Sequence, residues 1–502
     1  DVKRQVKNHI RWSGNNEISM QEAQMRTFSN FAWMFLRTEG DYNFSSGSRG
    51  RGNLSSTANP YFLFPQIYNF RYNIYSSEWP VANRAIELYL QKKSENEGWE
   101  RQINGLSNNE KANLLLEKHT FKELLADVEQ RNLQNNIVGL EASRLFARSE
   151  INMGVDAFRD SLYAMLKRNT FLNIKFENML DTLGEMSRTD LYSYLKEWEQ
   201  LTPLPFYSIG EPELTKVVNK GGEEFFVLKV LVSNNSDYDG IIQMNVLQNG
   251  WWYQPMEDPR ARKKVEIAAH TSKEFVSVWE EQIRDVEINT MVSGNLPYMI
   301  RQSIGNVKQE RNKIVKDTIY TLPESSLEMP GEVIVDNEDS TLFVLSTPAV
   351  VGLLPKWLDK VEDTSFKYSG ISWWRAPLQW TATTNAKYYG KYIRSAYVIK
   401  SGDGSQTATW KIPVPEAGQY ELYYHVFKDD ELRWNDRLQG EYHFRVAYDS
   451  EMEDAYINLR KANEGWEQLG TYYFSADTVR VVLTDECKLR SVTADAVKIV
   501  KR

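Results

Sequence analysis

Apolar residues in the amino-terminal part of the chain recur at the spacing of one helix face. Over residues 151–198 this spacing predicts three successive helices, the first with Phe158 and Leu162 on its buried side. The same pattern predicts helices over residues 17–37, 81–90 and 110–129. A proline-marked exit ends the pattern, because proline cannot continue a helix. We therefore predict a helical region over residues 1–205.

The spacing of apolar residues then changes to every second position. Residues 225–232 alternate as a strand does, and a turn rich in Asn, Asp and Gly leads to a second strand over 241–247. Further short strands are predicted over 264–268, 274–279 and 285–291. Strands of this length and spacing favour a small β-sandwich, which we place at residues 206–325. The charged and then proline-bearing stretch 306–330 is interpreted as a linker.

The last third of the chain also shows strand periodicity. Tyr420, Leu422 and Tyr424 alternate with polar or aromatic residues, and residues 479–483 repeat the pattern. A Gly-Asp-Gly sequence at 402–404 predicts a tight turn between two further strands. This part of the chain is therefore expected to be β-rich.

Six sequence blocks in this region resemble the golvesin C-terminal-like domain. The blocks are 331–339, 371–375, 400–410, 420–426, 465–474 and 493–500. That domain is a jelly-roll module related in architecture to carbohydrate-binding domains and often attached to bacterial exported enzymes. The resemblance implies a jelly roll at residues 326–502, a glycan or protein ligand, and a periplasmic or extracellular location.

The helical region carries a second resemblance. The segments Ile151–Arg159 and Ser187–Leu191, with Trp198 before the proline-marked exit, resemble the end of the catalytic domain in aminopeptidase-N-like gluzincin metallopeptidases. That family also has a β-sandwich directly after the catalytic domain. The two resemblances imply a multidomain α + β chain: a helical remnant of a thermolysin-like catalytic domain, a β-sandwich and a C-terminal β jelly roll.

The chemistry of that peptidase family requires residues that this sequence lacks. Its H-E-x-x-H motif places two zinc-binding imidazoles one helical turn apart. The histidines here are at positions 9, 119, 270, 425 and 443, and none begins the motif. In the family's tyrosine-x-x-glycine setting Gly139 matches, but Asn136 replaces the tyrosine that stabilises the oxyanion. We therefore predict no peptidase activity in this chain.

Composition narrows the choice of partners. The 502 residues suffice for about three domains, and a net charge of -8 gives no reason to expect nucleic acid. Cys487 is the only cysteine, which excludes an intrachain disulfide. No apolar run is long enough for a membrane span. Since Asp1 is preceded by no methionine or leader, the amino terminus is interpreted as trimmed.

One candidate site in the jelly roll is a structural calcium site. Jelly-roll carbohydrate-binding modules commonly use calcium to tie the first strand to the last. Here Asp336, Glu338 and Asp339 lie at one end of the region and Asp495 at the other, and carboxylate oxygens suit calcium. The alternative is a turn and a hydrogen-bonded acidic residue.

The second candidate is a sugar-binding surface. Exposed indole rings pack on the apolar faces of sugars, and an arginine can bond hydroxyls or carboxylates. The candidates are Trp373, Trp374, Arg375, Trp380 and Trp434. The alternative is that these tryptophans belong to the core, where Trp is usually found.

The function that these features favour is a non-catalytic exported binding protein, which recognises a glycan or a protein through its jelly roll. Two alternatives stay open. The chain could be the C-terminal portion of an active zinc aminopeptidase whose H-E-x-x-H region lies upstream of Asp1. It could also be a structural component of a membrane transport or envelope assembly.

Overall fold

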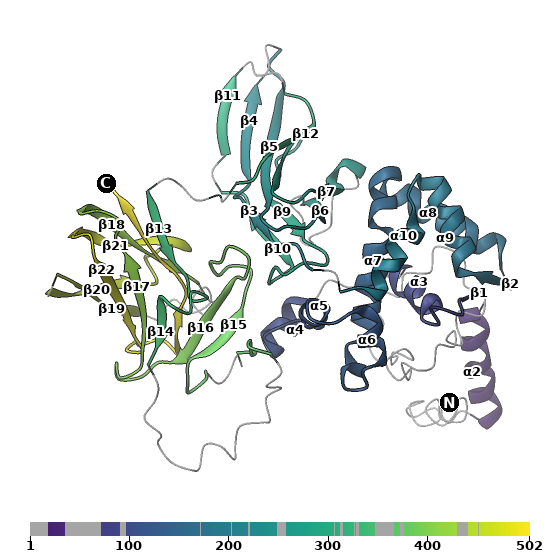
Figure 1. The fold of residues 1–502 in the computed structure, drawn as a ribbon, viewed down its shortest axis with the longest axis horizontal. Helices are drawn as coiled ribbons and strands as arrows, with labels where there is room; N and C mark the ends of the chain where they lie inside the picture. Colours follow the sequence, from purple (N-terminus) through teal and green to yellow (C-terminus); the bar gives the residue numbers. More distant parts are fainter. Residues whose placement is uncertain are drawn as a thin grey trace. The chain divides into compact units, whose positions relative to one another are not determined.

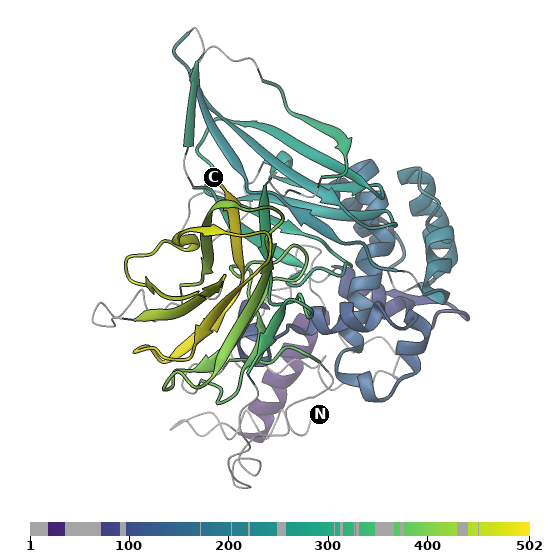
Figure 2. The same ribbon diagram turned by 60° about the vertical axis from the view of Figure 1, so that its left-hand side comes forward.

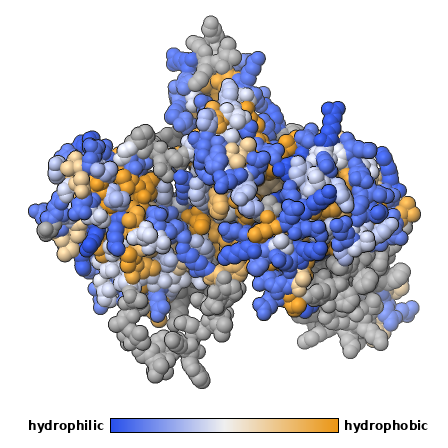
Figure 3. Space-filling view, viewed as in Figure 1, coloured by the Kyte–Doolittle hydropathy of each residue, from blue (hydrophilic) through white to orange (hydrophobic). Residues whose placement is uncertain are grey.

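The structure is a computed structural model in which the chain forms two compact units. One unit comprises residues 1–95 and 120–200, and the other comprises 96–119 and 201–502. The described residues are 19–35, 72–90, 97–170, 172–201, 203–218, 221–247, 258–305, 307–311, 315–325, 327, 331–346, 366–371, 376–428, 440–449 and 451–502. Charged and polar residues cover most of the face seen in Figure 3, with apolar residues between them.

The first unit is mainly helical (Figure 1). Its helices are α2 (Met20–Phe35), α3 (Ala82–Leu90), α6 (Phe121–Ala126), α7 (Gln134–Met153), α8 (Val155–Arg168), α9 (Phe176–Ser187) and α10 (Leu191–Lys196), with 3-10 turns η3 (Glu129–Asn132) and η4 (Glu197–Glu199). Two short strands, β1 (Tyr72–Tyr75) and β2 (Leu172–Lys175), pair in parallel. No helix in the described part of the chain combines the length and apolarity of a membrane span.

An aromatic cluster holds the helices of this unit together. Trp198 is 1% exposed, and its ring centroid lies 5.2 Å from that of Trp79 and 4.7 Å from that of Phe121. The ring of Phe176, at the start of α9, stacks with that of Trp198 at a centroid distance of 6.4 Å. Three aromatic rings from different segments of the chain therefore surround the indole of Trp198.

Two of the predicted helices are interrupted. The helix expected over 110–129 is two helices, α5 (Asn108–Leu116) and α6, because Thr120 and Glu123 form a capping box that starts a new helix. Gly154 has a positive φ of 90°, which ends α7 and starts α8. The polar stretch before residue 109 also contains a helix, α4 (Glu97–Asn104).

Helices α4 and α5 belong to the second unit, although the sequence pattern groups them with the helical region. The side chain of Asn109 donates a hydrogen bond of 3.1 Å to the hydroxyl of Tyr298. Asn113 donates one of 3.2 Å to the backbone oxygen of Met291. These polar contacts fasten α5 to a loop of the sandwich.

The predicted β-sandwich is present as two sheets. Their strands are β3 (Tyr207–Ile209), β4 (Glu213–Val218), β5 (Glu224–Asn234), β6 (Gly240–Leu247), β7 (Arg262–Ile267), β8 (Thr271–Trp279), β9 (Asp285–Asn289), β10 (Met299–Ser303), β11 (Val307–Arg311) and β12 (Thr318–Pro323), with the 3-10 turn η5 (Pro259–Ala261). One sheet has the order β10-β9-β6-β7 and the other β11-β4-β5-β8-β12, with β3 beside β5. Buried Val230, Ile242, Phe275 and Val286 fill the space between the sheets.

The linker predicted over 306–330 is wrong at residues 307–311 and 318–323, which are strands. Strand β11 pairs in parallel with β4, and β12 pairs antiparallel with β8, so both are edge strands of the larger sheet. Their side chains are mostly exposed or half-buried. Edge strands of this kind are rich in polar residues. Their composition therefore resembles that of a linker.

The carboxy-terminal part of the second unit contains three sheets (Figures 1 and 2). Its strands are β13 (Glu332–Val335), β14 (Phe343–Leu345), β15 (Thr381–Thr384), β16 (Ser395–Lys400), β17 (Thr407–Pro413), β18 (Gly418–Val426), β19 (Glu441–Tyr448), β20 (Glu451–Asn458), β21 (Gly465–Phe474), β22 (Thr478–Thr484), β23 (Ser491–Ala494) and β24 (Val497–Lys501). The sheet orders are β13-β24-β18-β21, β14-β17-β22-β19-β20 and β15-β16-β23. Fully buried Trp410, Tyr420, Tyr424 and Phe444 belong to one core. This arrangement is compatible with the expected jelly roll.

The aromatic cluster yields a prediction for the helical unit. Replacing Trp198 by alanine should lower its free energy of unfolding by about 3–5 kcal/mol, because a large cavity opens among the packed rings. Urea denaturation followed by far-ultraviolet circular dichroism measures the change. Tyr192, which is 38% exposed on the neighbouring helix, provides the control. Its replacement by alanine should change the free energy by about 0.5 kcal/mol or less, and equal effects of the two substitutions would contradict the prediction.

Candidate functional site

Strand β18 presents aromatic side chains on both faces of its sheet. Tyr420, Leu422 and Tyr424 are fully buried and point into the core. Successive side chains of a strand point to opposite faces, so Tyr423 and His425 lie on the outer face, where both are half-buried. Aromatic rings on the outside of a sheet are not needed to fill its core.

The neighbouring strands add to this outer face. In the register of the sheet, Trp466 of β21 lies opposite His425, and Lys498 of β24 lies opposite Tyr423. The ammonium group of Lys498 is 4.8 Å from the ring centroid of Trp466 and 5.4 Å from that of Tyr423. It also pairs with Glu332 of β13 at 2.8 Å. The cation is thus held against two aromatic rings.

A loop between β15 and β16 supplies a fourth ring. The ring centroid of Tyr389 lies 5.0 Å from that of Trp466 and 5.8 Å from that of His425. The rings of His425 and Trp466 are 5.1 Å apart and nearly perpendicular. We call Tyr389, Tyr423, His425, Trp466 and Lys498 together the aromatic face. All five residues are half-buried, so part of each side chain is accessible to solvent.

Beneath the aromatic face lies Asp495, which is 0% exposed and follows β23. Its Oδ2 is 2.8 Å from Nδ1 of His425, and the backbone N–H of Tyr389 donates to both carboxylate oxygens at 3.2 Å. With the carboxylate ionised, Nδ1 carries the hydrogen, and Nε2 is directed away from Asp495. One buried carboxylate therefore fixes a ring of the sheet and the backbone of the loop.

Nearby hydrogen-bond donors and an arginine compensate for the negative charge of Asp495. Burial raises the pKa of Asp495, whereas His425, the Tyr389 N–H and Arg394 each lower it. Burial in turn lowers the pKa of Arg394 to about 10. Its Nη1 donates to the backbone oxygen of Ala386 at 2.8 Å. Arg394 and the two hydrogen-bond donors thus offset part of the cost of burying a carboxylate.

The predicted calcium ligands have protein partners instead. Glu338 accepts hydrogen bonds from Lys367 at 2.5 Å, from the hydroxyl of Tyr368 at 3.0 Å, and from Ser395. Asp339 accepts one from the backbone N–H of Asp336 at 3.0 Å. Among the residues that the structure describes, no three His, Cys, Asp or Glu side chains form a group that could hold a metal ion. The charges of Asp495, Glu338 and Asp339 all act on Asp336, and the calcium site stays a prediction.

The predicted sugar-binding residues are only partly visible. Trp373, Trp374, Arg375 and Trp434 lie outside the described residues. Trp380 is half-buried and packs against the jelly-roll core, so the core alternative applies to it. No residue of the aromatic face is among the site residues predicted from the sequence. The signal available was the alternation in β18, which places Tyr423 and His425 opposite the buried residues.

The described histidines are dispersed. His270 lies in the turn between β7 and β8, with Asp237 and Glu324 each 2.8 Å from one of its ring nitrogens. His443 lies on β19, where it stacks on Tyr456 with ring centroids 4.9 Å apart. Neither these residues nor His425 approach one another as metal ligands, and His9 lies outside the described residues.

Asp336 gives a pH-dependent prediction. Burial and the nearby charge of Asp495 raise its pKa well above the ordinary value. Between the unfolded and folded pKa values the folded protein binds more protons, so stability falls as pH rises through that interval. Replacing Asp336 by asparagine should therefore stabilise the domain at neutral pH. The gain should shrink towards about pH 4, where the native carboxyl is protonated.

Thermal unfolding of both proteins across this pH range measures the effect. Glu451→Gln on the exposed edge of β20 serves as the control and should leave Tm nearly unchanged. If Asp336 were instead a calcium ligand, Asp336→Asn would lower Tm at neutral pH and EDTA would destabilise the native protein. Either result would contradict the arrangement described above.

Comparison with known structures returned distant neighbours. A CBM35 from Cellvibrio japonicus Abf62 is 12% identical over 22% of this chain and 75% of its own, with a TM-score of 0.16. A Bacteroides uniformis beta-glucuronidase is 9% identical over 62% of this chain, with a TM-score of 0.17. This chain spans 31% of the length of that glucuronidase. TM-scores this low carry no argument about fold or function.

Comparison with protein families is more specific. The search of curated proteins returned no match. The Golvesin C-terminal domain family matches residues 374–501, a segment that contains all five residues of the aromatic face together with Asp495. Over residues 374–501 the chain is therefore similar to the Golvesin C-terminal domain.

Proposed function

We propose that this chain is a non-catalytic binding protein that recognises a glycan through the aromatic face of its golvesin-like domain. The observation that carries the proposal is the cluster of Tyr389, His425 and Trp466 on the outside of a sheet, with ring centroids 5.0–5.8 Å apart. Core packing does not require rings at these positions. All three residues are half-buried, and the side chain of His425 is 12% exposed.

The chemistry of the aromatic face suits a sugar. The C–H groups of a pyranose ring form an apolar surface that packs on an indole or phenol ring. The hydroxyl groups of the sugar need donors and acceptors at the edge of the contact. Lys498, the phenol groups of Tyr389 and Tyr423, and Nε2 of His425 are polar groups of this kind. An apolar surface with a polar rim therefore supports glycan recognition.

Asp495 supports the proposal through preorganisation. Its contacts with His425 and with the backbone of Tyr389 fix two parts of the aromatic face before a ligand arrives. A surface that is already ordered loses less side-chain entropy on binding. Preorganisation is important for glycan binding. The hydroxyl groups of a glycan exchange hydrogen bonds with water for hydrogen bonds with protein, which gives little net free energy.

This sequence lacks side chains that peptidase chemistry would require, which supports recognition without bond cleavage. The sequence has no H-E-x-x-H motif, and Asn136 stands where the similar peptidases have tyrosine. Asn136 lies in the first turn of α7 and Gly139 is buried one turn later.

We expect the chain to act outside the cytoplasm, in the periplasm or the extracellular space.

Replacing Trp466 by alanine tests the proposal. The substitution removes the ring that contacts Tyr389, His425 and Lys498, so glycan affinity should fall about tenfold or more. A glycan array with the full chain selects the ligand, and isothermal titration calorimetry measures the affinity. Trp466→Phe keeps an aromatic face and should retain part of the binding.

The matched control is Tyr456→Ala. Tyr456 is 58% exposed on β20 of the opposite sheet, so its loss should leave the affinity unchanged. The proposal fails if the native chain binds no glycan on the array. It also fails if Trp466→Ala, with native circular dichroism, binds as tightly as the native chain.

A further inference from the structure

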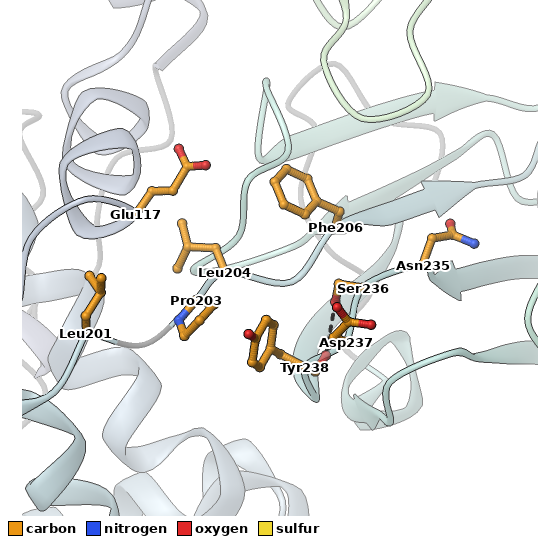
Figure 4. Close-up of a pocket in the computed structure, with 9 residues that line it drawn as sticks. All are labelled: Glu117, Leu201, Pro203, Leu204, Phe206, Asn235, Ser236, Asp237 and Tyr238. Atoms are coloured by element: carbon orange, nitrogen blue, oxygen red, sulfur yellow. Dashed lines mark hydrogen bonds between the residues drawn. The ribbon is translucent and has the colours of Figure 1, made fainter.

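A pocket of about 400 Å³ lies within the second unit, at the amino-terminal end of the sandwich (Figure 4). The end of α5, the segment leading into β3 and the turn between β5 and β6 form its walls. Its lining includes Glu117, Leu201, Leu204, Phe206, Asp237 and Tyr238. None of these residues belongs to the aromatic face.

Apolar side chains form the floor of the pocket. Leu204 is 4% exposed, and Phe206 packs against Tyr392 with ring centroids 5.5 Å apart. Leu201 and Tyr238 are about half exposed, at 51% and 46%, and both line the pocket. An apolar body of small size can therefore replace water on this floor.

Hydrogen bonds fix the wall formed by the β5–β6 turn. The side chain of Asn234 donates to the backbone oxygens of Tyr238 at 2.7 Å and Ile267 at 3.0 Å, and accepts from Ser236. The hydroxyl of Ser236 also lies 3.1 Å from the backbone oxygen of Tyr238, the contact drawn in Figure 4. Asn235 is held by Ser208 at 2.6 Å. The wall is therefore formed before any ligand binds.

The charges at the pocket are negative. Figure 4 shows Glu117 and Asp237 on different sides, with Leu204 and Phe206 between them. Glu117 directly follows α5, whose last backbone carbonyls add partial negative charge. His270 pairs with Asp237 through one ring nitrogen and with Glu324 through the other, so two carboxylates share one imidazole. None of the described residues that line the pocket is a lysine, arginine or histidine.

We propose that this pocket binds a small organic cation, an ammonium or guanidinium group joined to an apolar body. The apolar part would lie on Leu204 and Phe206, and the cationic group would face Glu117 or Asp237. A volume of about 400 Å³ is at the lower end for ligand pockets and suits a molecule of the size of one or two amino acids. The same carboxylates repel an anion of equal shape.

The experiment compares two probes of similar shape and opposite charge, 2-phenylethylamine and 3-phenylpropionate. Ligand-observed NMR with the full chain measures their affinities. The amine should bind about tenfold or more tightly than the carboxylate. In the double variant Glu117→Gln, Asp237→Asn the preference should be lost, because both carboxylates become neutral amides of similar size.

Glu213→Gln is the matched control, since Glu213 lies on β4, its side chain is 56% exposed, and it does not line the pocket. This variant should keep the preference for the amine. Tyr238→Ala should weaken both probes, because it removes part of the apolar wall. Equal binding of the two probes by the native chain, or an unchanged preference in a folded double variant, would overturn the proposal. Absence of amine binding at millimolar concentration would overturn it as well.

Discussion

The hydrogen bonds of the buried Asp495 carboxylate are the constraint on which the aromatic face depends. Asp495 lies between two strands, β23 and β24, and joins the ring of His425 on β18 to the backbone of Tyr389 in a separate loop. A carboxylate without exposure is costly unless donors surround it. The donors that satisfy it are the same groups that shape the outer face. The burial of Asp495 and the geometry of the aromatic face therefore depend on the same hydrogen bonds.

The sequence predicts the fold well where strands have buried side chains. Residues 420–426 alternate because one face of β18 is packed, whereas the apolar run 225–232 has buried residues on both faces of β5, and both segments are strands in the structure. The prediction fails where neither face is deeply buried, as in β11 and β12, whose composition resembles that of a linker. The break between α5 and α6 could have been predicted, since Thr120 and Glu123 have the spacing of a capping box.

The candidate site was less predictable than the fold. Tryptophans were selected by residue type, yet Trp380 packs against the core, whereas Trp466 faces outward. What brings Trp466 beside His425 is the register between β18 and β21, and strand register depends on contacts far apart in sequence. Asp495 was predicted as a calcium ligand, and in the structure it contacts His425 and the backbone N–H of Tyr389. Its hydrogen-bond partners come from two distant segments that sequence spacing does not connect.

The order of the sheet β13-β24-β18-β21 has a consequence for biosynthesis. Strand β24, near the carboxy-terminal end of the printed sequence, lies between β13 and β18. Until β24 has emerged from the ribosome, the facing edges of β13 and β18 lack their backbone partner. An unpaired edge invites association with other chains, so nascent copies of this domain are exposed to misassembly until translation passes residue 501.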